Sequence, residues 1–217
     1  MKKAFKKDIR SVVVKVGTSI LTKNDRFDRE LIGRLGAEVS DLLKKGLSVS
    51  IVSSGAIGAG MTILKTKKRP KTMEGLQAAA AVGQRYLMQC YEDAFSRRGY
   101  STAQVLLTWD DMVDPRRFMN AKRTLREIQK RGLVPVINEN DTVATDEIRF
   151  GDNDRLSSLL SILIEADLLV ILSDTDGLRS GGSAGQRIQV VETMDKSVFA
   201  HVKDSNNSFT VGGMRSK

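Results

Sequence analysis

A lysine stands inside one of the apolar runs of this chain. The run reads Val14-Lys15-Val16 and is followed by Gly17, Thr18 and Ser19. A buried ammonium is unfavourable unless it meets an anion, and glycine with small hydroxyl residues leaves backbone N–H groups free to approach one. We therefore predict that Lys15 binds a phosphate group. An edge-strand lysine that points to water is the simpler alternative.

A second candidate is a stretch with almost no bulky side chains. It reads Ser53-Ser54-Gly55-Ala56-Ile57-Gly58-Ala59-Gly60 and follows another apolar run. Its glycines are spaced GxxGxG, which is neither the nucleotide pattern GxxxxGK[ST] nor the dinucleotide pattern GxGxxG. The composition favours close contact with a ligand, and a tight strand-to-helix turn without a ligand remains the alternative.

Acids and amides form the third candidate. Asn138-Glu139-Asn140-Asp141-Thr142 and Gly151-Asp152-Asn153-Asp154 belong to a stretch, 138–154, with six acids opposed by Arg149 alone. Clustered carboxylates repel one another and persist where a metal ion, an ammonium or a lysine is held. The alternatives are that Asp154 only caps a helix and that Asp141 is only a turn residue.

Two further polar stretches contain glycine. Ser173-Asp174-Thr175-Asp176-Gly177 follows an apolar run, and Gly212-Gly213-Met214-Arg215-Ser216-Lys217 combines glycines with a lysine. The first has the composition of a ligand-binding turn. The second could equally be a frayed terminus.

These stretches need a scaffold that brings them together. Apolar, β-branched runs alternate with amphipathic stretches, which predicts an α/β fold with a parallel sheet and helices on both faces. Strands are expected at Ser11–Val16, Leu47–Val52, Thr102–Leu107, Val134–Ile137 and Leu168–Leu172, helices at Arg29–Lys45, Glu74–Arg98, Pro115–Arg131 and Asp154–Ala166, and a β-hairpin at Thr142–Phe150. Because ligands bind beyond the carboxyl ends of such strands, the polar turns stand at the right edge.

Composition excludes several classes of protein. The chain has 217 residues, of which 41% are hydrophobic, with one cysteine and one histidine, so a disulfide framework and a Cys/His zinc cluster are excluded. GxSxG is absent, which argues against a serine hydrolase. No stretch approaches the ~20 apolar residues of a membrane span. These features predict a soluble, cytoplasmic globular protein.

The net charge of +9 comes from two short segments. Residues 1–10 contribute +4 and residues 65–71 contribute +5, so the rest of the chain is neutral. We interpret these segments as a solvated tail and a mobile loop. Nucleic-acid binding is the less favoured alternative.

Taken together, the motifs resemble the amino-acid kinase family. The resemblance is carried by Val-Val-Lys-Val-Gly-Thr-Ser at 13–19, Val-Ser-Ser-Gly-Ala-Ile-Gly-Ala-Gly at 52–60, Ala-Ala-Val-Gly-Gln at 80–84, Val-Pro-Val-Ile-Asn-Glu-Asn-Asp at 134–141, Gly-Asp-Asn-Asp at 151–154 and Gly-Gly-Met-Arg-Ser-Lys at 212–217. It implies a three-layer αβα sandwich with a mainly parallel central sheet. It also implies transfer of the γ-phosphoryl group of magnesium-bound ATP to a carboxylate.

The 134–141 and 151–154 motifs match the branch of the family that phosphorylates the side-chain carboxylate of L-glutamate, the first step of proline biosynthesis. The same fold acting on UMP, N-acetylglutamate or aspartate is the first alternative. A non-catalytic, nucleic-acid-binding or regulatory module is the second.

The resemblance also implies roles for individual residues. Lys15 would contact the transferring phosphoryl group, Lys217 would hold the ATP phosphates from the other side, and Asp154 would orient both lysines. Glutamate would be held by Ser54, Gly55, Asn138, Asp141, Asp152 and Asn153, with acids on its ammonium and amides on its carboxylate. The nucleotide would be held by Gly17, Thr18, Ser173, Asp174, Gly212 and Gly213. No side chain is assigned to the metal.

At the level of the whole protein, the resemblance implies a homo-oligomer, either a dimer or a tetramer, and raises proline as a feedback inhibitor. Residues 1–217 are expected to form one kinase domain. The family continues with a further helix and strands after its Gly-Gly-Met motif, so the carboxyl-terminal part of the domain is expected to be missing, with no second domain.

Overall fold

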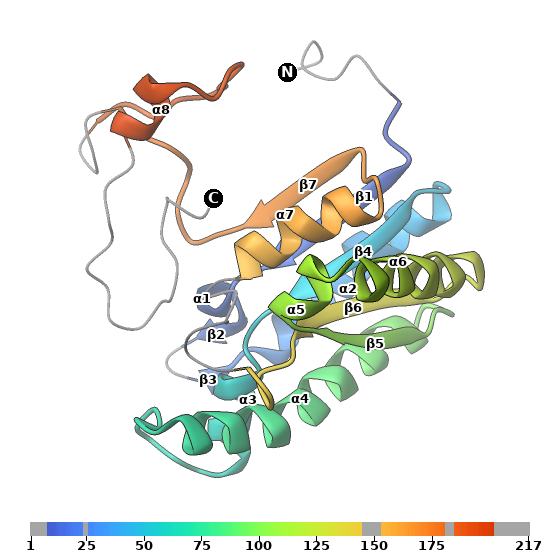
Figure 1. Cartoon of the computed structure of the whole chain (residues 1–217). Helices are drawn as coiled ribbons and strands as arrows, with labels where there is room; N and C mark the ends of the chain where they lie inside the picture. The colour runs from blue at the N-terminus through green and yellow to red at the C-terminus, as the bar shows by residue number, and fades with distance from the viewer. Residues whose placement is uncertain (1–7, 24–25, 145–152, 181–184, 202–217) are drawn as a thin grey trace.

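A parallel sheet forms the centre of the molecule (Figure 1). The computed structural model describes residues 8–23, 26–144, 153–180 and 185–201. Within these residues the sheet has the order β5-β6-β4-β1-β7, and each neighbouring pair is parallel. The strands are β1 (Ser11–Val16), β4 (Ser48–Ser53), β5 (Thr102–Leu107), β6 (Val134–Glu139) and β7 (Leu168–Leu172).

Helices cover both faces of this sheet (Figure 1). One face carries α2 (Arg29–Lys44), α3 (Ala56–Ile63) and α4 (Met73–Ser96), and the other carries α5 (Trp109–Val113), α6 (Pro115–Lys130) and α7 (Asn153–Leu163). Short elements complete the described chain: α1 (Thr18–Leu21), β2 (Thr22–Lys23), β3 (Arg26–Phe27) and α8 (Lys196–Ala200). The predicted three-layer αβα sandwich is confirmed.

Alternation along β1 explains why both faces are apolar. Val12, Val14 and Val16 pack into the core on the side of α2 and α4, whereas Val13 packs into the core on the side of α6 and α7. Successive side chains of a strand point to opposite faces, so a central strand that is covered on both sides has to be apolar at nearly every position. Lys15 breaks this rule on the α7 side.

The chain reverses its direction across the sheet once. It moves from β1 through β4 to β5 by way of α2, α3 and α4, and then returns to β6 and β7 with α5, α6 and α7 on the opposite face. Right-handed crossovers require this change of face when the direction reverses. The neighbouring strands β4 and β6 therefore lead to helices on opposite faces, which opens a crevice at their carboxyl ends.

Two glycines hold α3 directly against α4. A Cβ atom added at Gly60 would lie 1.8 Å from the Ala79 carbonyl oxygen, and one added at Gly83 would lie 1.8 Å from the Ala56 carbonyl oxygen. The helix backbones are therefore in contact. This corrects the prediction of a ligand-binding turn over 53–60, because Ser53 ends β4, only Ser54 and Gly55 form the turn, and residues 56–60 are helix.

Other boundaries also differ from the predictions. Strand β6 continues to Glu139, because Asn138 and Glu139 still pair with Leu106 and Leu107 of β5. The hairpin predicted at Thr142–Phe150 is wrong at its start, where residues 141–143 form a turn and the Val143 N–H donates to the Asn140 carbonyl oxygen. Residues 145–150 lie outside the described residues.

The helix ends follow the predictions closely. Gly46, Gly99 and Gly132 come just after α2, α4 and α6, all with positive φ. The basic run 65–71 lies in the connection between α3 and α4, where its lysines are exposed. Among the described residues, no helix has the length and apolarity that crossing a bilayer requires.

Candidate active site

A buried ion pair lies at the carboxyl end of β1. The Lys15 Nζ atom is 2.5 Å from Asp154 Oδ1, and the two side chains are 6% and 1% exposed. Because β1 lies between β4 and β7, the edge-strand alternative for Lys15 is excluded. Lys15 is therefore a buried lysine that meets an anion of the protein itself, Asp154. Its contact with a phosphate group stays a prediction.

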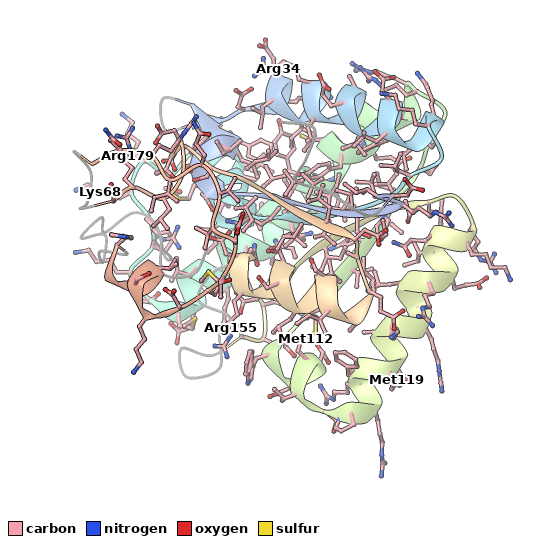
Figure 2. All side chains as sticks on the ribbon, turned by 90° about the horizontal axis from the view of Figure 1, so that it is seen from above. Arg34, Lys68, Met112, Met119, Arg155 and Arg179 are labelled. Carbon is pink, nitrogen blue, oxygen red and sulfur yellow. The ribbon has the colours of Figure 1, made fainter. Side chains whose placement is uncertain are left out.

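Asp154 occupies the first turn of α7. The helix begins at Asn153, so Asp154 is a helical residue and the interpretation as an N-cap alone is wrong. The positive end of the helix dipole favours a carboxylate there. The next residue, Arg155, stacks over the Trp109 ring with Cζ 3.9 Å from the ring centroid, which ties the start of α7 to α5 (Figure 2).

Space beside the lysine is kept by Gly17. Its φ of −74° is ordinary, so the absence of a side chain is what matters. A Cβ atom there would lie 3.4 Å from Lys15 Nζ and 3.5 Å from the Leu172 carbonyl oxygen. The turn after β1 and the end of β7 therefore flank the ammonium, and a side chain would narrow the space between them.

The polar turn after β7 lies next to the turn after β1, because the two strands pair directly. The Ser173 hydroxyl is 3.0 Å from the Thr175 hydroxyl and accepts a hydrogen bond from the Thr175 N–H. Asp174 and Thr18 are exposed at this edge. Their positions are compatible with the predicted nucleotide contacts.

A cluster of amides spans the crevice between β4 and β6. Asn153 Nδ2 lies 2.9 Å from each of three acceptors, which are the Ser53 carbonyl oxygen, Ser54 Oγ and Asn138 Oδ1. Asn138 in turn donates from Nδ2 to Gln84 Oε1 at 2.9 Å. The cluster links α7, β4, β6 and α4, so it connects both faces of the sheet at one point.

Two backbone groups set which way these amides face. The Glu139 N–H donates to Asn138 Oδ1, so that atom has to be the oxygen, and the Ser53 carbonyl oxygen requires Nδ2 of Asn153 on its side. Among the residues that the structure describes, Asn153 Oδ1 and Gln84 Nε2 are buried without a hydrogen-bond partner. Buried polar atoms are normally paired, so these two indicate a ligand with a donor and an acceptor of its own.

The turn at Ser54 and Gly55 forms the floor of the crevice. The Ser54 N–H donates to the Val16 carbonyl oxygen, and Gly55 has φ +89°, a conformation that other residues adopt only with strain. Beneath the turn, the Tyr91 hydroxyl lies 3.0 Å from Ser53 Oγ in the core. Burial raises the pKa of Tyr91, so the phenol stays protonated and available for this hydrogen bond.

Replacing Tyr91 with phenylalanine tests this support. Ser53 Oγ retains its hydrogen bond to the Ser54 carbonyl oxygen, so the change removes one net hydrogen bond and creates no unpaired donor. We expect a loss of about 1 kcal/mol of unfolding free energy and a thermal midpoint lower by a few degrees. Urea denaturation monitored by circular dichroism measures it. An unchanged midpoint would contradict the structural role.

The structure brings together five of the predicted site residues, namely Lys15, Ser54, Asn138, Asn153 and Asp154. Asp141 lies in the turn after β6, in agreement with the alternative of a turn residue, and is only partly exposed. The remaining predictions, Asp152, Gly212, Gly213 and Lys217, lie outside the described residues.

Sequence reasoning included Gln84 only within the 80–84 motif, without a role, and did not single out Tyr91. Both lie on α4 and are seven residues apart, so they share one face of the helix. Polar side chains at that spacing on an otherwise apolar helix face are a signal that could have found them. No group of three His, Cys, Asp or Glu side chains suited to a metal ion occurs in the described part of the chain.

Comparison with known proteins agrees with this geometry. A family model described as "Amino acid kinase family" matches residues 10–217. The chain belongs to the amino acid kinase family. The resemblance noted in the sequence is thereby confirmed.

Curated relatives within the family are glutamate 5-kinases. The protein of Geobacter metallireducens is 44% identical over 223 residues, which cover 100% of this chain and 60% of the relative. The protein of Thermoanaerobacter sp. is 45% identical over 211 residues (95% and 57%), and that of Pseudomonas savastanoi pv. phaseolicola is 46% identical over 211 residues (94% and 57%). The chain thus spans about 60% of the length of these relatives.

Proposed function

We propose that this chain transfers the γ-phosphoryl group of ATP to the side-chain carboxylate of L-glutamate, the reaction after which its relatives are named. This reaction would be the first step of proline biosynthesis. The observation that supports it most is the buried Lys15–Asp154 pair beside the amide cluster. It offers a cation to a phosphate and polar atoms to an amino acid within one crevice. Membership of a kinase family agrees with phosphoryl transfer.

Charge is the main obstacle to this reaction. Carboxylate and triphosphate are both anions, and two like charges ~4 Å apart repel by about 4 kcal/mol at an effective dielectric near 20. The protein lowers this barrier by positioning the reactants and by supplying positive charge at the phosphoryl group. Lys15 would supply that charge, and Asp154 would hold the ammonium in place.

The acceptor end of the site is assigned from the hydrogen bonds. Because Ser54 Oγ accepts from Asn153, its own proton is free to donate to a carboxylate of glutamate. Asn153 Oδ1 faces away from its protein partners as an acceptor, so we assign it to the ammonium, together with Asp141 and Asp152. This assignment changes the predicted role of Asn153, which was contact with the carboxylate.

The nucleotide end rests more on the resemblance. Lys217, Gly212 and Gly213 would complete it with Gly17, Thr18, Ser173 and Asp174. We assign Mg²⁺ to the ATP phosphates, as the resemblance implies, and to no side chain of the protein. A homo-oligomer, inhibition by proline and a cytoplasmic location stay predictions.

A comparison of acceptors tests the proposal. With Mg²⁺ and ATP, we expect the full chain to release ADP in proportion to added glutamate, and at least about tenfold more slowly with UMP, N-acetylglutamate or aspartate at equal concentration. A coupled assay for ADP measures this. Faster release with another acceptor would reassign the substrate. Salt-dependent RNA binding that is lost on neutralising residues 65–71, without any turnover, would favour the nucleic-acid alternative.

A further inference from the structure

We infer that Gln84 is a positioning residue of this site, which fixes the orientation of the Asn138 carboxamide and, through it, that of Asn153. The identity of the acceptor rests on the function proposed above, whereas the orientation of the amides rests on hydrogen bonds alone. None of the site roles implied by the family resemblance falls on Gln84.

The position of Gln84 follows from the contact between α3 and α4. Gln84 follows Gly83, whose Cα lies so close to the Ala56 carbonyl oxygen that no Cβ would fit. This contact presses α4 against the start of α3 and so brings Gln84, 8% exposed, under the crevice. Its Oε1 then lies 2.9 Å from Asn138 Nδ2.

Gln84 closes a chain of hydrogen bonds in which only one orientation works. Asn138 Oδ1 accepts from the Glu139 N–H and from Asn153 Nδ2. A flipped Asn138 would direct its own N–H groups at both of these donors. Gln84 Oε1 is the acceptor that receives the N–H on the other side, so it stabilises the working orientation and disfavours the flipped one.

The orientation of Asn138 decides what the substrate meets. When Asn138 Oδ1 faces Asn153, Asn153 Nδ2 donates to acceptors of the protein. Asn153 Oδ1 is then the atom of this carboxamide that has no hydrogen-bond partner among the residues that the structure describes. A buried carbonyl oxygen is complementary to an ammonium. If Asn138 lost its orientation, Asn153 would lose one of its acceptors and its oxygen would no longer be fixed toward the ligand.

A role in packing alone does not account for this side chain. Gln84 Nε2 is buried without a hydrogen-bond partner in the described part of the chain, which is unfavourable for folding. A methionine would fill the same volume without this unpaired donor, but it would leave Asn138 Nδ2 without its acceptor. The carboxamide of Gln84 is therefore explained by its hydrogen bond to Asn138 and not by packing.

The test is replacement by a side chain of the same length that cannot accept a hydrogen bond. For Gln84→Met we expect the KM for glutamate to rise at least tenfold, with the KM for ATP within twofold of wild type. Gln89→Met is the matched control, because Gln89 lies on the same helix and lines the same groove of about 600 Å³ between α4 and β5, but bonds only to Asp93 among the described residues. We expect no change in either constant for this control.

A double-mutant cycle tests whether Gln84 acts through Asn138. In an Asn138→Ala background, Gln84→Met should change the KM for glutamate by less than twofold, because the group it orients is gone. A further tenfold rise there would overturn the inference. So would a Gln84→Met protein with a lower thermal midpoint and an unchanged KM for glutamate, which is the behaviour of a purely structural residue.

A measurement on the wild-type protein keeps the inference testable if Gln84→Met does not fold. In a crystal structure with glutamate bound, Gln84 Oε1 should lie within hydrogen-bond distance of Asn138 Nδ2, and Asn153 Oδ1 within that of the substrate ammonium. Another partner for Asn138 Nδ2 overturns the inference. Failure of the proposed function gives a different result: the wild-type protein would release ADP with an acceptor other than glutamate. The same variants would then be measured with that acceptor.

Discussion

Lys15→Met lowers glutamate-dependent ADP release by about 10²–10³-fold. Removal of a single group that stabilises charge in a transition state lowers rates by about 10²–10³-fold, and Lys15 is the cation buried next to the acceptor crevice. Methionine keeps the apolar stem and removes only the charge. Steady-state kinetics at saturating ATP measure the effect, and turnover equal to wild type would remove Lys15 from the mechanism.

The same variant tests the ion pair itself. Asp154 is 1% exposed, so Lys15→Met leaves a buried carboxylate without the Lys15 ammonium, which lowers the unfolding free energy by about 3–5 kcal/mol. The double variant Lys15→Met with Asp154→Asn removes both charges. We expect it to recover most of the stability and none of the activity. If the double variant were less stable than Lys15→Met, loss of the ion pair would not explain the lower unfolding free energy of Lys15→Met.

Gly83→Ala prevents stable folding or lowers the unfolding free energy by at least about 3 kcal/mol, out of the roughly 5–15 kcal/mol that domains have. The added Cβ would lie 1.8 Å from the Ala56 carbonyl oxygen, and neither backbone can yield without separating α3 from α4. Soluble yield and the midpoint of thermal unfolding measure the effect. An unchanged midpoint would show that the helices are not in backbone contact.

Gly33→Ala is the control for this experiment. Gly33 is also a helical glycine, in the middle of α2, but a Cβ atom there meets nothing within 4 Å. Alanine in a helix interior is more favourable than glycine by roughly 0.5–1 kcal/mol. We therefore expect a slightly higher midpoint for Gly33→Ala, opposite in sign to the effect at Gly83.

Much of this architecture can be predicted from the sequence because burial leaves a clear pattern. A strand buried on both faces is apolar at nearly every position, so Lys15 stands out as an exception that needs an anion. Its partner, Asp154, lies far along the chain. The acidic stretch 138–154 indicated a site for a cation, but not which of its acids would pair with Lys15. The resemblance to a family, rather than spacing alone, gave these residues separate roles.

Other features leave no distinct pattern. Small residues at 56–60 suit both a ligand-binding turn and a tightly packed helix, and the contact between α3 and α4 that decides between them involves residues distant in the sequence. The sequence does not show which role Gln84 has in the site, because its contact with Asn138 joins residues that lie far apart in the chain. The polarity of Asn138 and Glu139 predicts that the strand ends at Ile137. In the structure β6 continues to Glu139, because pairing with β5 satisfies the backbone hydrogen-bonding groups of these two residues.

The contact between Gly60 and Gly83 also limits how this molecule can move during turnover. No layer of side chains separates the two helix backbones, so α3 and α4 cannot shift past one another easily. The turn at Ser54 and Gly55, which leads into α3, therefore moves together with α4 as one rigid body. The start of α7 is bonded to the same body, because Asn153 donates to the Ser53 carbonyl oxygen and to Ser54 Oγ. We therefore expect opening for substrate entry or product release to come from segments outside these contacts, with the distance between Lys15 and Asp154 unchanged.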